Sequence, residues 1–250
     1  MRIHQTVVAA LLLACGCAPA AAAQTAVLRP GSVEVSTQAI TDRVDEFEVQ
    51  AGGDGWVPVG RMTLRTRLAT VGGVEAVVRT ERIWMDDELV QLDSFTLHRK
   101  TLAPLAMHSS STETGVELAF TPGSVRQVDD GDWGADTSHV PLPEPVFAAG
   151  TTDLLLGSLP LAPGYHAELA VFDAEDGIDT IAIEVEAVEE VPLPEGGSVS
   201  AWRVGVTEGF LVSTYWMDRE SHTLVQFESS DGSLRIVRSR GGRSRARPTR

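Results

Sequence analysis

The alternation of apolar and polar residues along short segments constrains this fold more than any other feature of the sequence. In residues 61–68, the side chains of Met62, Leu64 and Leu68 fall on one face of an extended segment, and arginines and threonines occupy most of the positions between them. A period of two residues is typical of a strand with one buried and one wetted face. The Gly72-Gly73 pair that follows predicts a tight hairpin turn into the next strand.

Segments of this kind recur along the chain at near-regular spacing. Pairs such as Asp86-Asp87 and Asp231-Gly232 separate most of them and favour turns. Further strands are expected at residues 74–84, 89–98, 105–111, 116–121, 165–173, 180–188, 199–207, 210–217, 224–229 and 234–238. Many short strands joined by such turns predict an all-β, mainly antiparallel fold, in which a meander sheet curls into a half-barrel with one short helix or lid segment.

One proline-rich stretch, residues 129–164, departs from this pattern. Proline cannot donate to a ladder of backbone hydrogen bonds, so we expect an irregular connection here rather than a central strand. Within it, residues 152–159 predict a short helix with a threonine cap. Apolar side chains that include Val146 and Phe147 lead us to expect that this lid-like connection covers one open face of the curled sheet.

The first 23 residues have the layout of a secretory signal peptide. A short polar start precedes an apolar run at residues 7–14, and small residues then lead to Gln24. Cleavage before Gln24 leaves a single β domain at residues 24–234, followed by the C-terminal segment. The alternative is a lipobox, in which Cys15 is lipidated and becomes the N-terminus. Either route exports the protein, so we expect it in the periplasm or at the periphery of the outer membrane of a bacterial envelope.

The formal net charge of −15 hides an asymmetry between the body of the chain and its C-terminus. Residues 24–234 carry 12 basic and 35 acidic side chains, and such an acidic body disfavours nucleic acid as a partner. The last 16 residues carry seven arginines and no acid. We expect residues 235–250 to form a disordered basic tail. The alternative is that Arg243, Arg245 and Arg247 contact the phosphates of lipid head groups, because guanidinium groups pair with phosphate.

The sequence carries no motif for catalysis or for a cofactor. It has no Gly-x-Ser-x-Gly elbow, no Walker-type phosphate loop, no His-Glu-x-x-His pair and no Cys-x-x-Cys pair. Its histidines are scattered, and the acidic run at residues 129–136 lacks the ligand spacing of a calcium loop, which favours a solvated turn. We therefore expect a non-enzymatic protein without a metal or a cofactor.

Candidate ligand-binding residues come from large apolar side chains of the predicted strands and of the proline-rich connection. Trp84 and Trp216 each precede an acidic turn at a strand end. Large rings at such positions close the end of a β core; alternatively they line a pocket, since apolar clefts with few polar groups suit acyl chains. The candidate lining residues are Met62, Leu64, Trp84, Phe147, Leu155 and Trp216.

Residues 146–228 also carry a series of short motifs in a fixed order. Thr152-Asp-Leu-Leu-Leu precedes Leu161-Ala-Pro-Gly-Tyr165, and Tyr215-Trp-Met-Asp218 precedes Leu224-Val-Gln-Phe-Glu228. Taken in order, these motifs resemble a family of exported bacterial proteins known as domain of unknown function 3108. The resemblance implies the curved half-barrel architecture of bacterial lipoprotein carriers, and hence an envelope protein with an apolar concavity and no catalytic residues.

Two functions follow from these expectations. In the first, the protein binds an apolar or amphipathic ligand such as a lipid in a concave β-sheet, and it contacts a membrane surface through the arginine tail or a lipid anchor. In the alternative, it is a structural or interaction module of the cell envelope with a filled core and no ligand. An enzyme would need, inside the cavity, a cluster of polar side chains whose pKa values are shifted from their usual range.

Overall fold

The computed structural model describes residues 26–112, 114–131 and 134–239. These residues form one 16-stranded sheet and one short α-helix, α1 (Thr152–Leu156), preceded by a 3-10 turn, η1 (Ala149–Thr151). The strands are β1 (Val27–Leu28), β2 (Arg43–Ala51), β3 (Val57–Val71), β4 (Val74–Met85), β5 (Glu88–His98), β6 (Pro104–Ser111), β7 (Gly115–Thr121), β8 (Ser124–Gly131), β9 (Gly134–Pro141), β10 (Phe147–Ala148), β11 (His166–Asp173), β12 (Gly177–Pro192), β13 (Ser198–Glu208), β14 (Leu211–Asp218), β15 (Leu224–Glu228) and β16 (Leu234–Arg238).

Most strands pair with their neighbours in the sequence. Along the sheet the order is β1-β11-β12-β13-β14-β15-β16-β2-β3-β4-β5-β6-β7-β8-β9, and β10 pairs with β11 off this path. The pairs that β1 and β10 make with β11 are parallel, and the others are antiparallel. At the junction of β16 with β2, Ile236 pairs with Val49 and Arg238 with Phe47. The sheet therefore consists of two consecutive meanders joined side by side.

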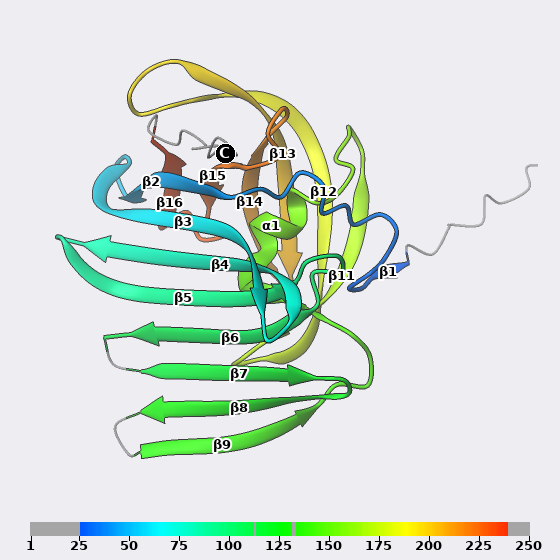
Figure 1. Ribbon diagram of the computed structural model, residues 1–250. Helices are drawn as coiled ribbons and strands as arrows, with labels where there is room; N and C mark the ends of the chain where they lie inside the picture. Colours follow the sequence, from blue (N-terminus) through cyan, green and yellow to red (C-terminus); the bar gives the residue numbers. More distant parts are fainter. Residues whose placement is uncertain (1–25, 113, 132–133, 240–250) are drawn as a thin grey trace, which may run out of the picture.

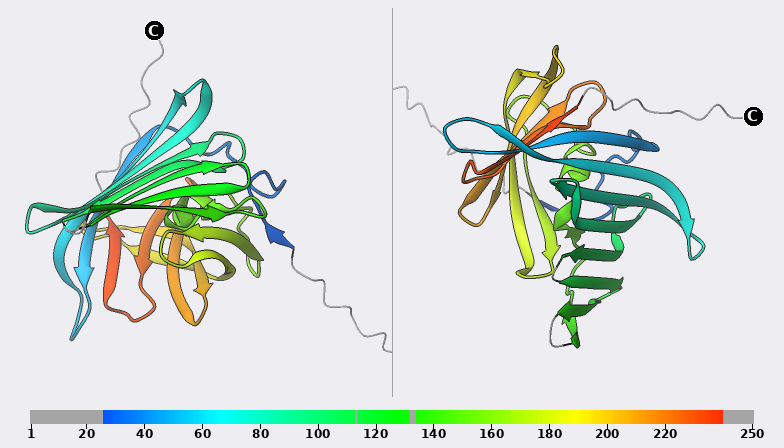
Figure 2. Two further views of the ribbon diagram at one scale, coloured as in Figure 1. Left: turned by 90° about the horizontal axis from the view of Figure 1, so that it is seen from below. Right: turned by 90° about the vertical axis from the view of Figure 1, so that its left-hand side faces the viewer.

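The sheet curls over on itself around this junction. Figure 1 and the left panel of Figure 2 show β2–β5 on one side, β11–β15 on the other, and α1 between them. The main core fills the space between the two sides. Its side chains Phe47, Leu64, Leu97, Leu155 and Met217 are each at most 2% exposed. Alternation along each strand thus places one face against this core and the other against water.

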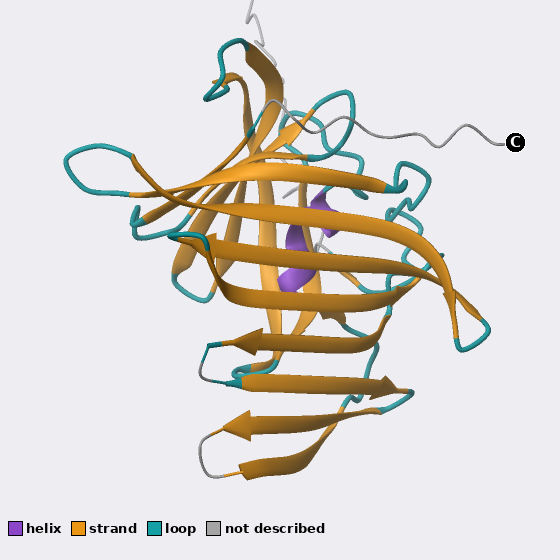
Figure 3. Cartoon of the chain, turned by 60° about the vertical axis from the view of Figure 1, so that its left-hand side comes forward, coloured by secondary structure: helices purple, strands orange, loops and turns teal. Residues whose placement is uncertain are grey.

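Strands β6–β9 extend beyond the main core as a ladder, which Figure 3 shows below the rest of the sheet. A second, smaller core that contains Leu118, Val125 and Phe172 supports one end of the ladder. The last strand, β9, pairs with β8 alone and is exposed at seven of its eight positions. It is one free edge of the sheet, whereas β1 and β10 cover β11 at the opposite end.

The predicted all-β fold, a curled and mostly antiparallel meander with one short helix, is confirmed. The structure corrects the extent of the proline-rich connection. Residues 129–131 end β8 and residues 134–141 form β9, so the irregular connection begins at Leu142. Both faces of β9 are wet, and for this reason its sequence shows no alternation. Pro141 is tolerated because it is the last residue of an edge strand.

The structure also corrects the start of the basic tail. Arg235 and Arg238 belong to β16, which lies inside the sheet between β15 and β2. Arg235 Nη2 lies 3.1 Å from Glu228 Oε2, and Arg238 Nη2 lies 3.0 Å from Asp218 Oδ2. Carboxylates within the fold therefore pair with these two guanidinium groups. The rest of the predicted tail, residues 240–250, lies outside the described residues, as does the predicted signal peptide.

Candidate functional site

Four of the six predicted lining residues lie together in the main core. Met62 and Leu64 come from β3, Phe147 from β10 and Leu155 from α1, and each is at most 3% exposed. Met62 and Leu64 border an open space, which is described below. Phe147, beside β11, and Leu155, on α1 itself, pack as ordinary core side chains.

The remaining two predicted residues, Trp84 and Trp216, lie on the outer face of the sheet. Trp84 is the cross-strand partner of Arg61, whose guanidinium carbon stands 4.5 Å from the centroid of the indole ring. Trp216 donates from Nε1 to Glu189 Oε2 at 2.8 Å and packs against Val225 in a small outer cluster. Adjacent positions of a strand point to opposite faces, so neither ring shares the inner space that Met62 borders.

A cluster of charged side chains lies on the inner face of the sheet beside α1. Arg79 of β4 is 2% exposed, forms an ion pair with Asp153 of α1, and donates from Nη1 to Thr66 Oγ1 at 2.9 Å. Nearby, Arg43 Nε donates to Asp45 Oδ2 at 2.9 Å. Burial lowers the pKa of Arg43, and the negative charge of Asp45 opposes that shift. Through its ion pair with Arg79, Asp153 ties α1 to the middle of β4.

Two further carboxyl groups of this cluster are cross-strand partners, Glu81 on β4 and Asp93 on β5. Burial raises the pKa of Glu81 to about 7, helped by the charges of Asp153 and Asp93 and opposed by Arg79. Asp93 is 7% exposed, and its Oδ2 accepts from Gln91 Nε2 at 2.6 Å. Among the described residues its Oδ1 has no donor. The inner charge cluster comprises Arg43, Asp45, Arg79, Glu81, Asp93 and Asp153.

A cavity of about 170 Å³, the inner cavity, borders this cluster between β3, α1 and β14. Its walls are Met62, Leu64, Glu81, Ala149, Gly150, Thr152, Asp153, Tyr215, Leu224, Phe227 and Ile236. Burial raises the pKa of the Tyr215 hydroxyl, and the negative charges of Asp153 and Glu81 raise it further, so this hydroxyl is neutral. The cavity is smaller than the roughly 300 Å³ at which drug-sized ligand pockets begin, because α1 fills most of the curl.

A larger cleft of about 390 Å³ lies where β6 begins, where β7 turns into β8, and where the chain leaves β9. These strand ends are on the right-hand side of the ladder in Figure 1. The lining residues are Ala103, Pro104, Leu105, Phe120, Thr121, Pro122, Gly123, Leu142, Pro143, Glu144, Pro145 and Val146. We call this space the proline cleft. Most of its walls are apolar, and Glu144 is the one charged side chain among them.

A charged pair marks the rim of the proline cleft. Arg29, which follows β1, forms an ion pair with Glu144 and donates from Nη1 to the carbonyl oxygen of Pro145 at 3.2 Å. The two paired side chains are 35% and 58% exposed, so both charges reach solvent. Leu142 and Val146 belong to the second core and hold this segment against the ladder. The cleft thus combines an apolar floor with a charged, solvent-facing edge.

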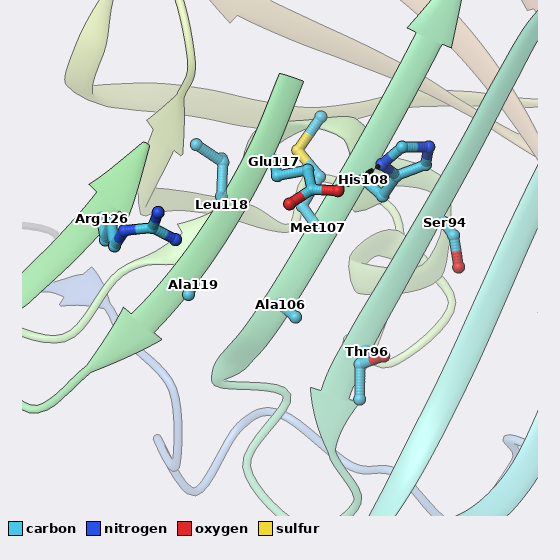
Figure 4. Close-up of a pocket in the computed structure, with 9 residues that line it drawn as sticks. All are labelled: Ser94, Thr96, Ala106, Met107, His108, Glu117, Leu118, Ala119 and Arg126. Atoms are coloured by element: carbon cyan, nitrogen blue, oxygen red, sulfur yellow. Dashed lines mark ion pairs between the residues drawn. The ribbon is translucent and has the colours of Figure 1, made fainter. Parts of the chain in front are cut away.

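A third depression, of about 280 Å³, has both polar and apolar lining residues and lies mainly on the outer face of β5–β8. Figure 4 shows its lining residues, with an ion pair between His108 Nδ1 and Glu117 Oε1 at 3.6 Å. These two side chains are 49% and 66% exposed. Their sequence neighbours Met107 and Leu118 belong to the second core instead. An ion pair this exposed contributes little binding energy, so the outer depression is a weaker candidate than the proline cleft.

Several predicted features lie outside the described residues, namely Cys15, Arg243, Arg245 and Arg247. Across residues 26–239, apart from the three that are not described, no group of three or more His, Cys, Asp or Glu side chains is arranged to hold a metal ion. In the same part of the chain, no helix has the length and apolar character to cross a membrane.

Sequence reasoning missed most of the proline cleft. Its walls come from three segments, residues 103–105, 120–123 and 142–146, which the ladder brings side by side. The available signal was the apolar residues that flank Pro122, Pro143 and Pro145 at turns. That signal does not reveal which turns share one end of a sheet, because the strand pairing decides it.

Known proteins supply a family for this chain and one solved structure to which it is similar. The model of the family DUF3108, described as a protein of unknown function, matches residues 46–238, which run from β2 to β16. Among solved structures, the chain is similar to a β-barrel-like protein of domain of unknown function DUF1849 from Brucella abortus. The identity is 10% and the TM-score 0.45, over 80% of this chain and 96% of that chain. No curated protein shows significant similarity to the sequence. With more than half of its length matched by the family model, the chain belongs to the DUF3108 family.

Proposed function

We propose that this chain is a non-enzymatic protein of the bacterial cell envelope that binds an amphipathic ligand with one apolar chain, such as a lipid, in the proline cleft. The observation that carries the proposal is an apolar cleft of about 390 Å³ with a charged pair at its rim. Pockets of about 300–1,000 Å³ that are mostly apolar, with a few placed polar groups, are typical of small-molecule sites.

The energetics favour a weak and exchangeable ligand. Burying about eight methylene groups against Leu105, Phe120 and Val146 contributes roughly 6 kcal/mol, at about 0.8 kcal/mol for each group. The lost freedom of ligand and protein offsets part of this gain. A contact of the head group with the rim is therefore needed for specific binding, and Arg29 is the group placed to make it.

Arg29 favours an anionic head group. Its guanidinium forms an ion pair with Glu144, and both side chains reach solvent. A phosphate or carboxylate head competes with Glu144 for the same donors, since guanidinium pairs bidentately with either group. Glu144 then turns to water at little cost, because an exposed ion pair is worth about 0–1 kcal/mol.

The subcellular localisation in this proposal is inferred from the sequence. The signal-peptide layout of residues 1–23 supports export to the periplasm or the outer-membrane periphery, and lipidation of Cys15 is the alternative route. Contact of the arginine tail, including Arg243, Arg245 and Arg247, with lipid phosphates accords with a ligand drawn from a membrane. The intact mass of the protein isolated from its own envelope distinguishes a diacylated chain from one that begins at Gln24.

Ligand binding is tested with the fluorescent probe 11-dansylaminoundecanoic acid. Ala103→Phe places a ring in the cleft, and we expect it to weaken binding at least tenfold. Ala106→Phe is the matched control, since the same change three residues away falls on an exposed position of β6. Arg29→Gln is expected to weaken binding of the anionic probe several-fold and to leave that of its methyl ester unchanged. Equal binding by the wild type and Ala103→Phe would refute the proposal.

A second candidate, a structural or interaction module with a filled core, has one observation in its favour. The edge of β9 is unpaired within the described sheet and its side chains are exposed on both faces. An edge of this kind is suited to adding a strand from another chain. The variant Thr137→Lys/His139→Lys, at two exposed positions of β9, tests it by sedimentation velocity. Self-association that is lost in this variant, without any probe binding, would favour this candidate.

A further inference from the structure

The inner charge cluster has more negative than positive charge. Its six ionisable side chains comprise two arginines, which are Arg43 and Arg79, and four carboxyl groups. The arginines make ion pairs with Asp45 and Asp153. Glu81 and Asp93 remain as two carboxyl groups without a cationic partner of their own.

Asp93 is buried and Glu81 is half-buried, and a carboxylate shielded from water is costly when it lacks a donor. Within the described residues, Glu81 makes no hydrogen bond and no ion pair. Its cross-strand partner Asp93 keeps Oδ1 buried without a donor. Native proteins satisfy nearly all buried polar atoms, so the buried Oδ1 of Asp93 beside the unpaired, half-buried Glu81 marks a local shortage of donors.

The unpaired carboxyl group of Glu81 faces a space of suitable size. Glu81 lines the inner cavity of about 170 Å³ together with Asp153 and Tyr215. Met62 and Phe227 are among the apolar walls of the same cavity. An engineered cavity of about 150 Å³ in another protein admits benzene, which sets the scale of a guest.

We propose that the inner cavity is a binding site for a primary ammonium group carried on a short apolar stem. The ammonium ion donates to Glu81 and Asp153, with the Tyr215 oxygen as a neutral acceptor, and the stem lies against Met62 and Phe227. An ammonium ion supplies three donors and one positive charge, which is the chemistry that the cluster lacks. The positive charge bound at Glu81 also stabilises the ionised form of the neighbouring Asp93.

The pKa of Glu81 reflects its lack of a cationic partner of its own. Burial and the nearby carboxylates raise this pKa to about 7, so the carboxyl group is partly protonated near neutral pH. Binding of an ammonium ion stabilises the ionised form of Glu81 and so lowers the pKa of this carboxyl group. Amine binding near neutral pH is therefore coupled to release of a proton from Glu81. The charged groups that face Glu81 are Arg79 on its own strand, Asp93 on β5 and Asp153 on α1.

The test compares benzylammonium with benzyl alcohol, which has a similar shape and no charge, by chemical-shift titration of the full-length protein. We expect wild type to bind benzylammonium at least tenfold more tightly than benzyl alcohol, and to bind it more tightly at pH 8 than at pH 6. Glu81→Gln is expected to abolish this preference. Glu117→Gln, at a position that is 66% exposed on β7, is the control and leaves it unchanged.

Two further measurements separate this site from others. Tyr215→Phe removes one acceptor without a change of shape, and we expect a several-fold weaker affinity for benzylammonium. Ala103→Phe, which fills the proline cleft, is expected to leave benzylammonium binding intact, so this inference and the proposed lipid site fail independently. Equal affinities of wild type for the two probes would overturn the inference, as would unchanged benzylammonium binding in Glu81→Gln.

Discussion

Loss of the carboxylate of Asp153 is expected to destabilise the fold strongly. Asp153→Asn keeps the shape of the side chain but leaves Arg79, which is 2% exposed, without its ion-pair partner. Removing one partner of a buried ion pair costs about 3–5 kcal/mol, because the remaining charge stays buried. For a domain of 150–250 residues, each kcal/mol lowers the Tm by about 2–4 °C, so we expect a decrease of roughly 6–20 °C.

Thermal and urea unfolding, followed by circular dichroism, measure this effect. Asp87→Asn is the control, because the ion pair of Asp87 with Arg61 is exposed and should change stability by less than about 1 kcal/mol. The double variant Arg79→Met/Asp153→Leu removes both charges, and we expect it to recover most of the lost stability. If Asp153→Asn lowers the free energy of unfolding by no more than Asp87→Asn does, the claim that the Arg79–Asp153 pair ties α1 to β4 is refuted.

Three other predictions follow from the same core and its outer face. Burial raises the pKa of Glu81 from 4.5 to about 7. The stability that protonated Glu81 contributes is therefore present below pH 4.5 and is lost as pH rises to about 7, a change of roughly 3 kcal/mol. Urea unfolding at several pH values should show this slope in wild type and not in Glu81→Gln. Gly150→Ala would place a Cβ 2.5 Å from Phe95 Cζ, and we expect a loss of about 1–3 kcal/mol in urea unfolding, whereas Gly53→Ala, which meets no atom within 4 Å, should cost less than 0.5 kcal/mol. Trp84→Ala should leave the affinity for the dansyl probe unchanged, because that ring lies on the outer face; a tenfold loss would show that it lines the ligand site.

The sequence by itself determined the class of the fold and much of its strand layout. Alternation along residues 61–68 requires a strand whose Met62 and Leu64 are buried, since only one face of that segment is apolar. The turn at Asp86-Asp87 could likewise be predicted, and both residues adopt the positive φ that such tight turns need. These features are local, so the identity of a few consecutive residues is enough to favour them.

Only the tertiary structure decided where the candidate sites lie. Arg79 is a charged residue in a strand and on sequence grounds is expected at a surface, yet it is buried because Asp153, 74 residues later, supplies its counter-charge. Trp84 has the large apolar side chain of a typical core residue, but its pairing with Arg61 places it on the outer face of the sheet. The proline cleft joins three turns that only the ladder brings together. Burial of charge and the closure of a cleft depend on contacts between distant segments, and local patterning carries no information about them.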